Sequence, residues 1–555
     1  MALQRTKTGY VLLAAVVIGV ALRVFQYAAS TSLWLDEIAV AQNVLDRSLW
    51  DLLTVPLSYD QTAPKGFLLA EKLAVTAFGP SDHALRLFPL LCALTGLVAF
   101  WRVAMRLLDE RAAAVAVGLF AAAPPLVTYG AQVKQYSTDV AVTVLLLWLA
   151  LALQQDGVAR GRRLAAGGAG AIAVWFSQPA VLVITGVAAS WVLIEWRERR
   201  KDQGPLRGTA PIMALWMASA TFAAAAGLAS LTPATRAYLD RFWASAFPAV
   251  PLRVDSTLIF AFDQLKALLG DGGPAGLAYP APALYLALAA VGFLVLLNRQ
   301  PKGAVLLLAP IGVAVLAAAA RQFPFSDRLI LFLVPSCLVA IAAGIRWIAG
   351  RLSPVGAGLG TLVVLALAAL AVYPVAVTTP VYRIEDIEPV LARLRTSLQR
   401  PGDAVYVYYG AGPAVRFYGS RYGLKENDYV VGGCHRGESR RYLDEIDRFR
   451  GRARVWVIVT HALDLYRERD DIVRYLDTIG RLREGFAVPS RSVGYQYPPA
   501  EAFLFDLSDP ARLSRAAAAS FPLMGPSSTE EAFRCGEGPH GMTGPQRAYR
   551  ARGAE

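Results

Sequence analysis

Two adjacent carboxylates, Asp36 and Glu37, are the residues of this chain whose type and position best suit chemistry. They follow the first long apolar stretch, residues 10–28, after only a few residues. Carboxylates at the mouth of a membrane helix are costly to desolvate, and they persist where they face a water-filled cavity and handle protons or ions. The structural alternative is that Asp36 caps a helix over residues 37–45. Spacing alone leaves both interpretations open.

The composition predicts a membrane protein. The chain has 555 residues, of which 55% are hydrophobic, and its mean hydropathy is +0.42. A transmembrane helix needs about 20 mostly apolar residues. A small-residue cleavage site does not follow the first stretch, so we expect no cleavable signal peptide. Eleven stretches are candidate spans: 10–28, 84–107, 112–128, 137–155, 164–176, 180–196, 210–230, 281–297, 304–320, 329–345 and 355–377.

The positive charge follows the expected topology. The net charge is +13, and the basic residues gather between the spans on one side, which is typical of cytoplasmic loops and does not indicate nucleic-acid binding. Eleven spans then give a multi-pass protein of the cell inner membrane with a cytoplasmic N terminus and an extracytoplasmic C terminus. The basic residues are Arg5 and Lys7; Arg102, Arg106 and Arg111; Arg160, Arg162 and Arg163; Arg197, Arg199, Arg200 and Lys201; Arg299 and Lys302; and Arg346 and Arg351.

The opposite side carries the long loops, where we expect the chemistry. The two longest are residues 29–83 and 231–280, and shorter ones are 129–136 and 321–328. The expected organisation is a transmembrane module over 1–377, an exported α/β domain over 378–519 and an irregular tail over 520–555.

The exported region reads as a mixed or parallel sheet, because strand and helix patterns alternate along it. A turn is expected at 410–413, which is too short for a nucleotide-binding glycine loop. We expect strands at 403–409, 454–460 and 503–507, and helices at 386–399, 439–449 and 468–483.

The four cysteines fall into two groups. Cys92 and Cys337 lie in membrane stretches and read as small apolar residues. Cys434 and Cys535 lie in the exported region, where a disulfide can form, although sequence alone does not fix the pairing. With four histidines and no metal-binding motif, we expect no metal site and no cofactor.

Several short motifs together resemble a known family. Residues 33–37 resemble the acidic first-loop motif of GT-C membrane glycosyltransferases, and more narrowly of the glycosyltransferase family 39 group. This group includes protein O-mannosyltransferases and bacterial lipid A aminoarabinose transferases. Lys65 is a departure, since many relatives have a second proline there. The resemblance continues, in the same order, through 61–69, 78–90, 129–139 and 327–335.

This resemblance implies a polytopic α-helical membrane protein of GT-C type, with about 11 transmembrane helices and a C-terminal exported α/β domain. It also implies a reaction, in which a sugar passes from a polyprenyl-phosphate donor in the bilayer to a hydroxyl of a cell-envelope acceptor, with inversion. A hydroxyl nucleophile needs a positioned base, and Asp36 matches the first acid of the family's motif. Glu37 would orient Asp36 or the acceptor. Some relatives place a divalent ion between acids, a role for which only Asp36, Glu37 and Asp139 are available here.

A leaving phosphate needs cations where its charge develops. The candidates on the expected face are Lys65, Lys134, Arg321 and Arg328, of which Arg328 matches an arginine of the family's pattern. Membrane-interface snorkelling is the alternative for each of them.

Three further residues have open roles in the sequence. Tyr136 could stack on the sugar or anchor the helix at the interface. Asp139 could contact sugar hydroxyls or pair with Lys134, although five residues on a helix place the two about 140° apart. Arg86 could pair with Asp82 or a first-loop acid.

Two other classes of protein stay open. A transporter would have many spans and interior charges, often with an inverted repeat, and no convincing repeat is visible. A non-catalytic envelope-assembly protein would give Asp36 only a capping role.

The predicted topology can be tested with reporter fusions. The basic segments place the C terminus outside the cytoplasm. A reporter that is active only outside the cytoplasm should therefore be active when it is joined after residue 400. Activity of a cytoplasm-only reporter at the same position would contradict this orientation.

Overall fold

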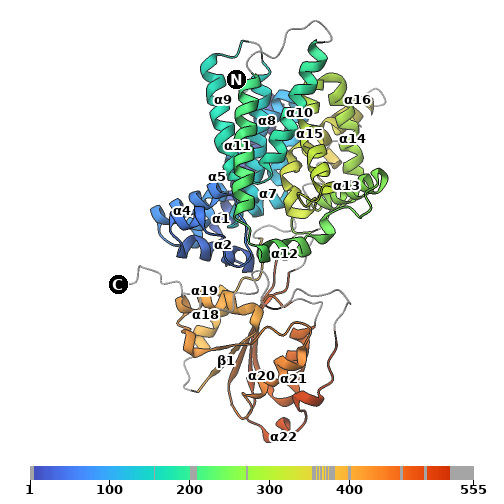
Figure 1. The fold of residues 1–555 in the computed structure, drawn as a ribbon. Coiled ribbons are helices and arrows are strands. Elements are labelled where there is room, and N and C mark those ends of the chain that lie inside the picture. The colour runs from blue at the N-terminus through green and yellow to red at the C-terminus, as the bar shows by residue number, and fades with distance from the viewer. Residues whose placement is uncertain are drawn as a thin grey trace.

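The computed structural model describes residues 6–155, 157–199, 209–270, 273–352, 382–397, 402–462, 467–492 and 497–525, with isolated positions between 358 and 373 and Cys535. Figure 1 shows a long helical bundle above a smaller domain that contains a sheet.

The helical bundle has the following elements. They are α1 Lys7–Ala28, α2 Leu35–Asp46, α3 Leu49–Thr54, α4 Lys65–Phe78, α5 Asp82–Leu107, α6 Glu110–Ala122, α7 Pro124–Thr128, η1 Tyr129–Ala131, α8 Tyr136–Leu153, α9 Arg160–Ala173, η2 Val174–Phe176, α10 Ala180–Arg199, α11 Thr209–Ala229, α12 Pro233–Phe242, η3 Ala244–Ala246, α13 Val254–Leu269, α14 Pro282–Arg299, α15 Pro301–Ala319, η4 Asp327–Leu333 and α16 Val334–Leu352.

The apolar stretches form membrane-length helices, as the sequence predicts for a polytopic protein. In the described ranges, eight helices are long and apolar enough to cross a membrane, and a ninth arises if α6 and residues Pro124–Ala131, bent by 61°, form one span. The stretch 164–176 becomes α9 and η2, and α9 has 14 residues. That length is short for a simple span. Most of 355–377 lies outside the described residues.

The smaller domain is a mixed five-stranded sheet in the order β2-β1-β3-β5-β4, with parallel β2-β1-β3 pairing and antiparallel β3-β5-β4 pairing. The buried strands β1, β3 and β5 are the three that the apolar runs predict. The elements are α18 Glu388–Ser397, β1 Ala404–Val407, η5 Tyr409–Ala411, α19 Gly412–Tyr418, η6 Gly419–Tyr422, η7 Glu426–Asp428, β2 Val430–Val431, α20 Ser439–Asp447, β3 Val455–Val459, α21 Glu468–Ile479, β4 Arg481–Val488, β5 Ala500–Asp506, α22 Pro510–Leu513 and η9 Ala518–Ser520.

Two local predictions in this domain are wrong. The helix expected over 468–483 ends at Ile479, because the chain enters the edge strand β4, whose mostly exposed residues give no apolar run. The turn expected at 410–413 is instead the end of η5 and the start of α19, where Pro413 occupies an early helical position. Proline fits there because its missing N–H would have no partner in the first turn.

The two parts of the chain share a hydrophobic core. Residues of α2 and α4, such as Ile38 and Phe67, pack in one buried cluster with Ile387, Val415 and Phe417 of the smaller domain. Figure 1 shows α2, α4 and α12 at the end of the bundle that faces this domain. The two long loops of the sequence, 29–83 and 231–280, therefore lie at the same end of the bundle as the α/β domain.

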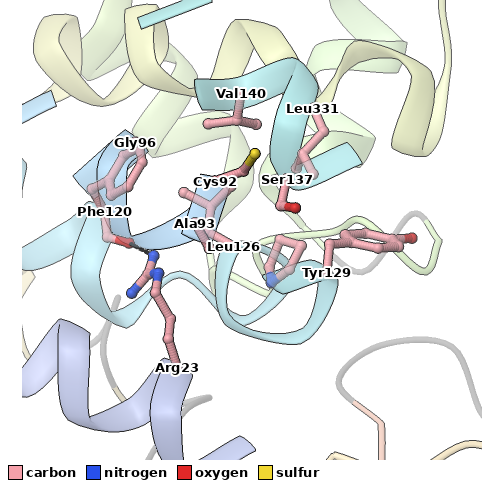
Figure 2. A pocket seen from close by; sticks show the side chains of 11 residues that line it. Arg23, Cys92, Ala93, Gly96, Phe120, Leu126, Tyr129, Ser137, Val140 and Leu331 are labelled. Carbon is pink, nitrogen blue, oxygen red and sulfur yellow. Dashed lines mark hydrogen bonds between the residues drawn. The ribbon is translucent and has the colours of Figure 1, made fainter. Parts of the chain in front are cut away.

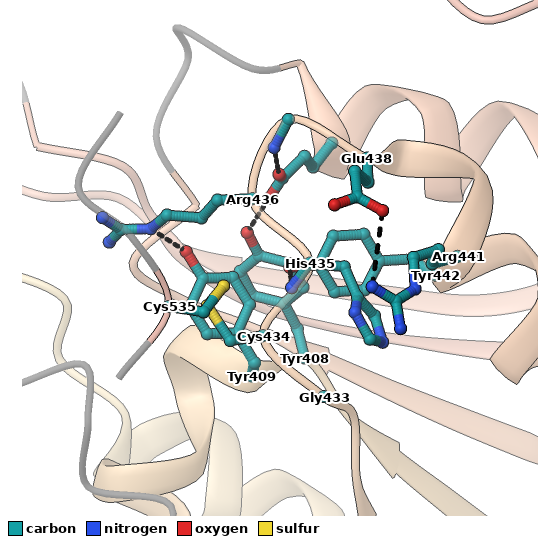
Figure 3. Close-up of a disulfide and its surroundings, with 12 residues drawn as sticks. Tyr408, Tyr409, Gly433, Cys434, His435, Arg436, Glu438, Arg441, Tyr442 and Cys535 are labelled. Carbon is teal, nitrogen blue, oxygen red and sulfur yellow. Dashed lines mark hydrogen bonds and ion pairs between the residues drawn. A yellow bond between two sulfur atoms is a disulfide. The ribbon is translucent and has the colours of Figure 1, made fainter. Parts of the chain in front are cut away.

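A disulfide joins Cys434 and Cys535, which are 101 residues apart, so the pairing that the sequence allowed is confirmed. Figure 3 shows the bond beside the loop that carries His435 and Arg436. Hydrogen bonds hold this loop against η5 and α21, since Arg436 donates to the Tyr409 hydroxyl and Gly437 N donates to Glu468 Oε1. Apart from Cys535, the predicted tail beyond residue 525 lies outside the described residues.

The disulfide is expected to stabilise the smaller domain. Cys535→Ser should lower its thermal stability, since the chain-entropy model gives about 4–5 kcal/mol for a closed loop of this size. Thermal unfolding of the purified protein with and without reductant measures the effect. Reductant should destabilise the wild type and leave Cys535→Ser unchanged. An equal response of both proteins, or two free thiols in non-reducing peptide mapping, would contradict the bond.

Candidate active site

The acid pair lies in the first turn of α2, where negative charge is favourable. The helix begins at Leu35 with Trp34 as its N-cap, and Trp34 N donates to Glu37 Oε2 at 3.3 Å. Asp36 is therefore inside the first turn and does not cap the helix. The capping role considered for Asp36 falls to Glu37.

Glu37 is buried in a network of hydrogen bonds. Arg86 of α5 donates to both of its carboxylate oxygens at 3.2 Å, and Val133 N donates to Oε1 at 2.8 Å. The guanidinium also donates to the carbonyl oxygens of Thr31 and Ser32, at 2.6 and 3.3 Å. Of the partners that the sequence left open, Arg86 takes the first-loop acid Glu37. The pair ties the first loop, α5 and the segment before α8 together.

Asp36 points toward positive charge. Its Oδ2 lies 3.5 Å from Arg328 Nη2, and the two side chains are 17% and 12% exposed. Burial would raise the pKa of Asp36, but nearby positive charge, chiefly that of Lys134 and Arg328, outweighs it and holds the pKa below its ordinary value. Asp36 is therefore ionised at neutral pH, yet it keeps some access to solvent.

Arg328 lies at the start of η4, where three aromatic rings surround it. Its guanidinium carbon is 5.8 Å from the ring centre of Tyr136, 5.9 Å from Phe242 and 5.5 Å from Trp243. Phe242 and Trp243 belong to the second long loop, so that loop forms part of the site. Aromatic faces stabilise a guanidinium by cation–π attraction, and they fix its direction.

The neighbouring residue Asp327 fastens the second long loop to η4. Its Oδ1 accepts a hydrogen bond from Ala275 N at 2.9 Å.

Lys134, just before α8, and Asp139, in the first turn of α8, do not pair with each other. Lys134 is buried and donates to Gln61 Oε1 at 2.8 Å, which joins it to the first loop. Asp139 is buried beside Ser177, and its Oδ1 has no hydrogen-bond partner in the described part of the chain. The interaction considered between Lys134 and Asp139 is replaced by the bond to Gln61.

Two predicted phosphate-binding cations have their contacts elsewhere. Lys65 Nζ donates to the Leu52 carbonyl at 3.1 Å, and the guanidinium of Arg321 lies 4.9 Å from the ring centre of Phe247. The structure thus gathers Asp36, Lys134 and Arg328, together with Tyr136, and gives Lys65 and Arg321 other partners.

The site includes residues that sequence reasoning missed. Gln61 lies inside a motif whose individual positions carried no assigned role, and Trp243 lies in a loop without a motif. His461 comes from the smaller domain, far away in sequence, and only its position just after a predicted buried strand could have drawn attention to it.

The donor set for a metal is poor in the described ranges. No group of three or more His, Cys, Asp or Glu side chains there could hold an ion. Glu37, the acid next to Asp36, has both carboxylate oxygens hydrogen bonded by Arg86 and Val133 N. These residues do not fit a metal between the two acids.

One cavity in the described part of the bundle is too small for a sugar. It has a volume of about 10 Å³ and lies among α1, α5, α6 and α8, between Arg23, Cys92 and Tyr129. Figure 2 shows Arg23 directed at the backbone of Phe120 in its wall. This volume is about that of one water molecule, so the cavity belongs to the packed interior of the bundle.

The resemblance to GT-C glycosyltransferases is confirmed by a family match. Residues 63–223 match the model of the family described as dolichyl-phosphate-mannose-protein mannosyltransferase. The match covers less than a third of the chain. The matched range includes Lys134, Tyr136 and Asp139. It does not include Asp36 or Arg328, so the match does not test the role of Asp36 as the base. No curated protein matches the chain.

Among solved structures, the chain is similar to three that cover most of its length. For the oligosaccharyltransferase of Archaeoglobus fulgidus the identity is 13% and the TM-score 0.47, covering 88% of this chain and 73% of that one. For ArnT of Cupriavidus metallidurans bound to undecaprenyl phosphate the values are 14% and 0.44, covering 90% and 98%. For arabinofuranosyltransferase AftD from mycobacteria they are 14% and 0.36, covering 92% and 42%.

Glu71 gives a prediction on stability. This α4 residue is fully buried without a hydrogen-bond partner among the described residues. Burial, and then the charge of Glu37, raise its pKa well above the ordinary value. An acid whose pKa is raised in the folded protein binds its proton more tightly there than in the unfolded chain. Its contribution to the folding stability is fully present below the unfolded pKa, about 4.3, and is lost as the pH rises toward the folded pKa.

The amide of Glu71→Gln mimics the protonated acid and does not titrate. The thermal stability of Glu71→Gln relative to the wild type should therefore be higher at pH 8 than at pH 5. The exposed Glu438→Gln serves as a control and should follow the wild type. Thermal unfolding in detergent at both pH values measures this, and an unchanged pH dependence in Glu71→Gln would contradict a buried neutral acid.

Proposed function

We propose that this chain is an inverting glycosyltransferase of the cell inner membrane, with its α/β domain outside the cytoplasm. It moves a sugar from a polyprenyl-phosphate donor to a hydroxyl of a cell-envelope acceptor, which is a lipid, a glycan or a protein. The observation that supports this most is the ionised Asp36 beside Arg328, with Lys134 close enough to lower its pKa. One site thus offers a base and the cations that a leaving phosphate needs.

Asp36 is the proposed base. The acceptor hydroxyl attacks the anomeric carbon from the side opposite the phosphate, and Asp36 receives its proton. A single displacement needs one base and no covalent intermediate on the enzyme, and it inverts the sugar. The lowered pKa of Asp36 leaves the carboxylate free of a proton before the reaction.

Arg328 and Lys134 are the proposed phosphate-binding groups. Preorganised cations lower the barrier when they face the atom where negative charge develops. Arg328 is held by three aromatic rings and Lys134 by Gln61, so neither has to be reorganised when the donor binds. Tyr136 lies against Arg328 and offers a face to the sugar. Asp139, buried at the start of α8 with an unpartnered oxygen, is the proposed contact for a sugar hydroxyl.

The test is release of free polyprenyl phosphate from a labelled lipid-linked sugar by the purified protein. Asp36→Asn should lower turnover by about 10²–10⁴-fold, the usual contribution of a general base, while the protein still folds. Arg328→Ala should impair both kcat and KM, since it serves donor binding and the leaving group. Glu37→Gln should also cost activity, because it weakens the contacts to Arg86 and Val133.

Asp255→Asn is the matched control, since Asp255 is 61% exposed in an exported loop and pairs with Arg253. It should retain wild-type turnover. Near-wild-type turnover of Asp36→Asn would reject the base. The absence of any released polyprenyl phosphate from the wild type, across donors extracted from the native membrane, would favour a transporter or an assembly protein.

A further inference from the structure

A histidine–glutamate pair lies where the smaller domain meets the first loop. His461 Nδ1 and Glu385 Oε1 are 2.8 Å apart, and the side chains are 11% and 3% exposed. His461 follows β3 after one residue, at the carboxyl ends of the parallel strands β1 and β3. Ligand and catalytic groups of α/β sheets collect at this edge.

Both residues have unusual backbone angles. The φ values are 54° for His461 and 49° for Glu385, in the left-handed region that side chains other than glycine rarely adopt. The backbone of His461 is also packed tightly, since a Cβ on Gly410 would lie 2.9 Å from its carbonyl oxygen. Strained backbone that the surroundings enforce is concentrated at functional sites.

The segment that carries Glu385 is bound to the loop that carries Asp36. Asp386 Oδ1 accepts hydrogen bonds from Ser32 N at 3.0 Å and Ser32 Oγ at 2.5 Å, and Glu388 N donates to Ser32 Oγ at 2.9 Å. Ser32 precedes Asp36 by four residues, so Glu385 is fixed at the entrance to α2.

Two more contacts make the same connection. Gln26 and Tyr382 exchange two hydrogen bonds of 2.8 and 2.9 Å. The Trp34 ring meets the edge of Tyr497 at 5.7 Å between ring centres. Consistent with this placement, a positive charge on His461 would act on the Asp36 carboxyl.

We propose that His461 is the onward proton acceptor of this active site, oriented by Glu385 and contributed by the α/β domain. The inference rests on the proposed glycosyl transfer and adds a group that carries its proton away. A carboxylate whose pKa is held low binds a proton weakly, so Asp36 benefits from an imidazole to which the proton can pass.

The reaction balances in the following way. The acceptor oxygen forms a bond to the anomeric carbon, and the bond from that carbon to the phosphate oxygen breaks, with its electron pair leaving on the lipid phosphate. The hydroxyl proton passes to Asp36 and from there to the imidazole of His461. Glu385 stabilises the imidazolium, which returns the proton to solvent. A buried acid that orients an imidazole and supports its charged form is the arrangement known from catalytic triads.

The same domain offers a matched control. His435 Nε2 lies 3.0 Å from Glu445 Oε1, but Glu445 also accepts hydrogen bonds from the Tyr406 hydroxyl and Gly433 N. This pair thus serves a network inside the smaller domain, beside the disulfide of Figure 3.

The experiment compares His461→Ala, His461→Gln, Glu385→Gln and His435→Gln in the polyprenyl-phosphate release assay. His461→Ala and His461→Gln should lower kcat by about 10²–10⁴-fold, with the donor KM within about threefold of wild type. Added imidazole should restore at least about tenfold of the activity of His461→Ala. Glu385→Gln should lose less and gain nothing from imidazole, and His435→Gln should keep wild-type kcat.

The outcomes separate the inference from the function on which it rests. Wild-type-like kcat in His461→Gln would overturn the proton role, because glutamine can keep the hydrogen bond to Glu385 but cannot carry the proton. Loss of activity in His461→Ala without imidazole rescue would assign His461 a structural role and overturn it too. A wild type that releases no polyprenyl phosphate would instead overturn the proposed function.

Discussion

The buried ion pair between Glu37 and Arg86 is the interaction on which the arrangement of this site depends. The two side chains are 2% and 4% exposed. Removing one partner of such a pair leaves an unpaired buried charge, which costs about 3–5 kcal/mol. Through Thr31, Ser32 and Val133, the pair fixes the backbone on both sides of the site. The directions of Asp36 and Lys134, which neighbour these positions, follow from it.

Around Asp36, charge is balanced between elements that are far apart in the sequence. The cations, Lys134 and Arg328, come from the segment before α8 and from η4. Each of them by itself would be an ordinary residue at a helix end. Together they keep one partly accessible carboxylate ionised. In the proposed reaction the same cations bind the donor phosphate, so the base and the leaving-group site are built from one set of charges.

The α/β domain is part of the site. It shares a hydrophobic core with α2 and α4, and its segment from Tyr382 to Glu388 is hydrogen bonded to the first loop. This contact places the carboxyl ends of β1 and β3 toward Asp36. A disulfide on the same domain fixes the loop that follows β2. The acceptor specificity of the proposed enzyme is therefore expected to depend on this domain as well as on the second long loop.

The sequence alone determined the features that depend on local composition. Long apolar stretches predict the spans, because length and hydropathy suffice for a helix in a bilayer. The buried strands β1, β3 and β5 are apolar runs, so they can be recognised, whereas β4 is a polar edge strand whose first residues the sequence predicts as the end of the preceding helix. The acid pair and Arg328 could be singled out because they lie in short motifs at the ends of apolar stretches.

Only the tertiary structure decided which residues meet. Arg86 bonds to Glu37 across 49 residues and Lys134 to Gln61 across 73, while Glu385 and His461, 76 residues apart, form a pair beside the first loop. None of these pairs has a periodic or local signal, because each arises where separate helices and a second domain pack together. The pairing of Cys434 with Cys535 is of the same kind. The sequence thus determined which charged groups the chain must place at one end of its bundle, and the packing decided which of them neutralise each other and which face the site.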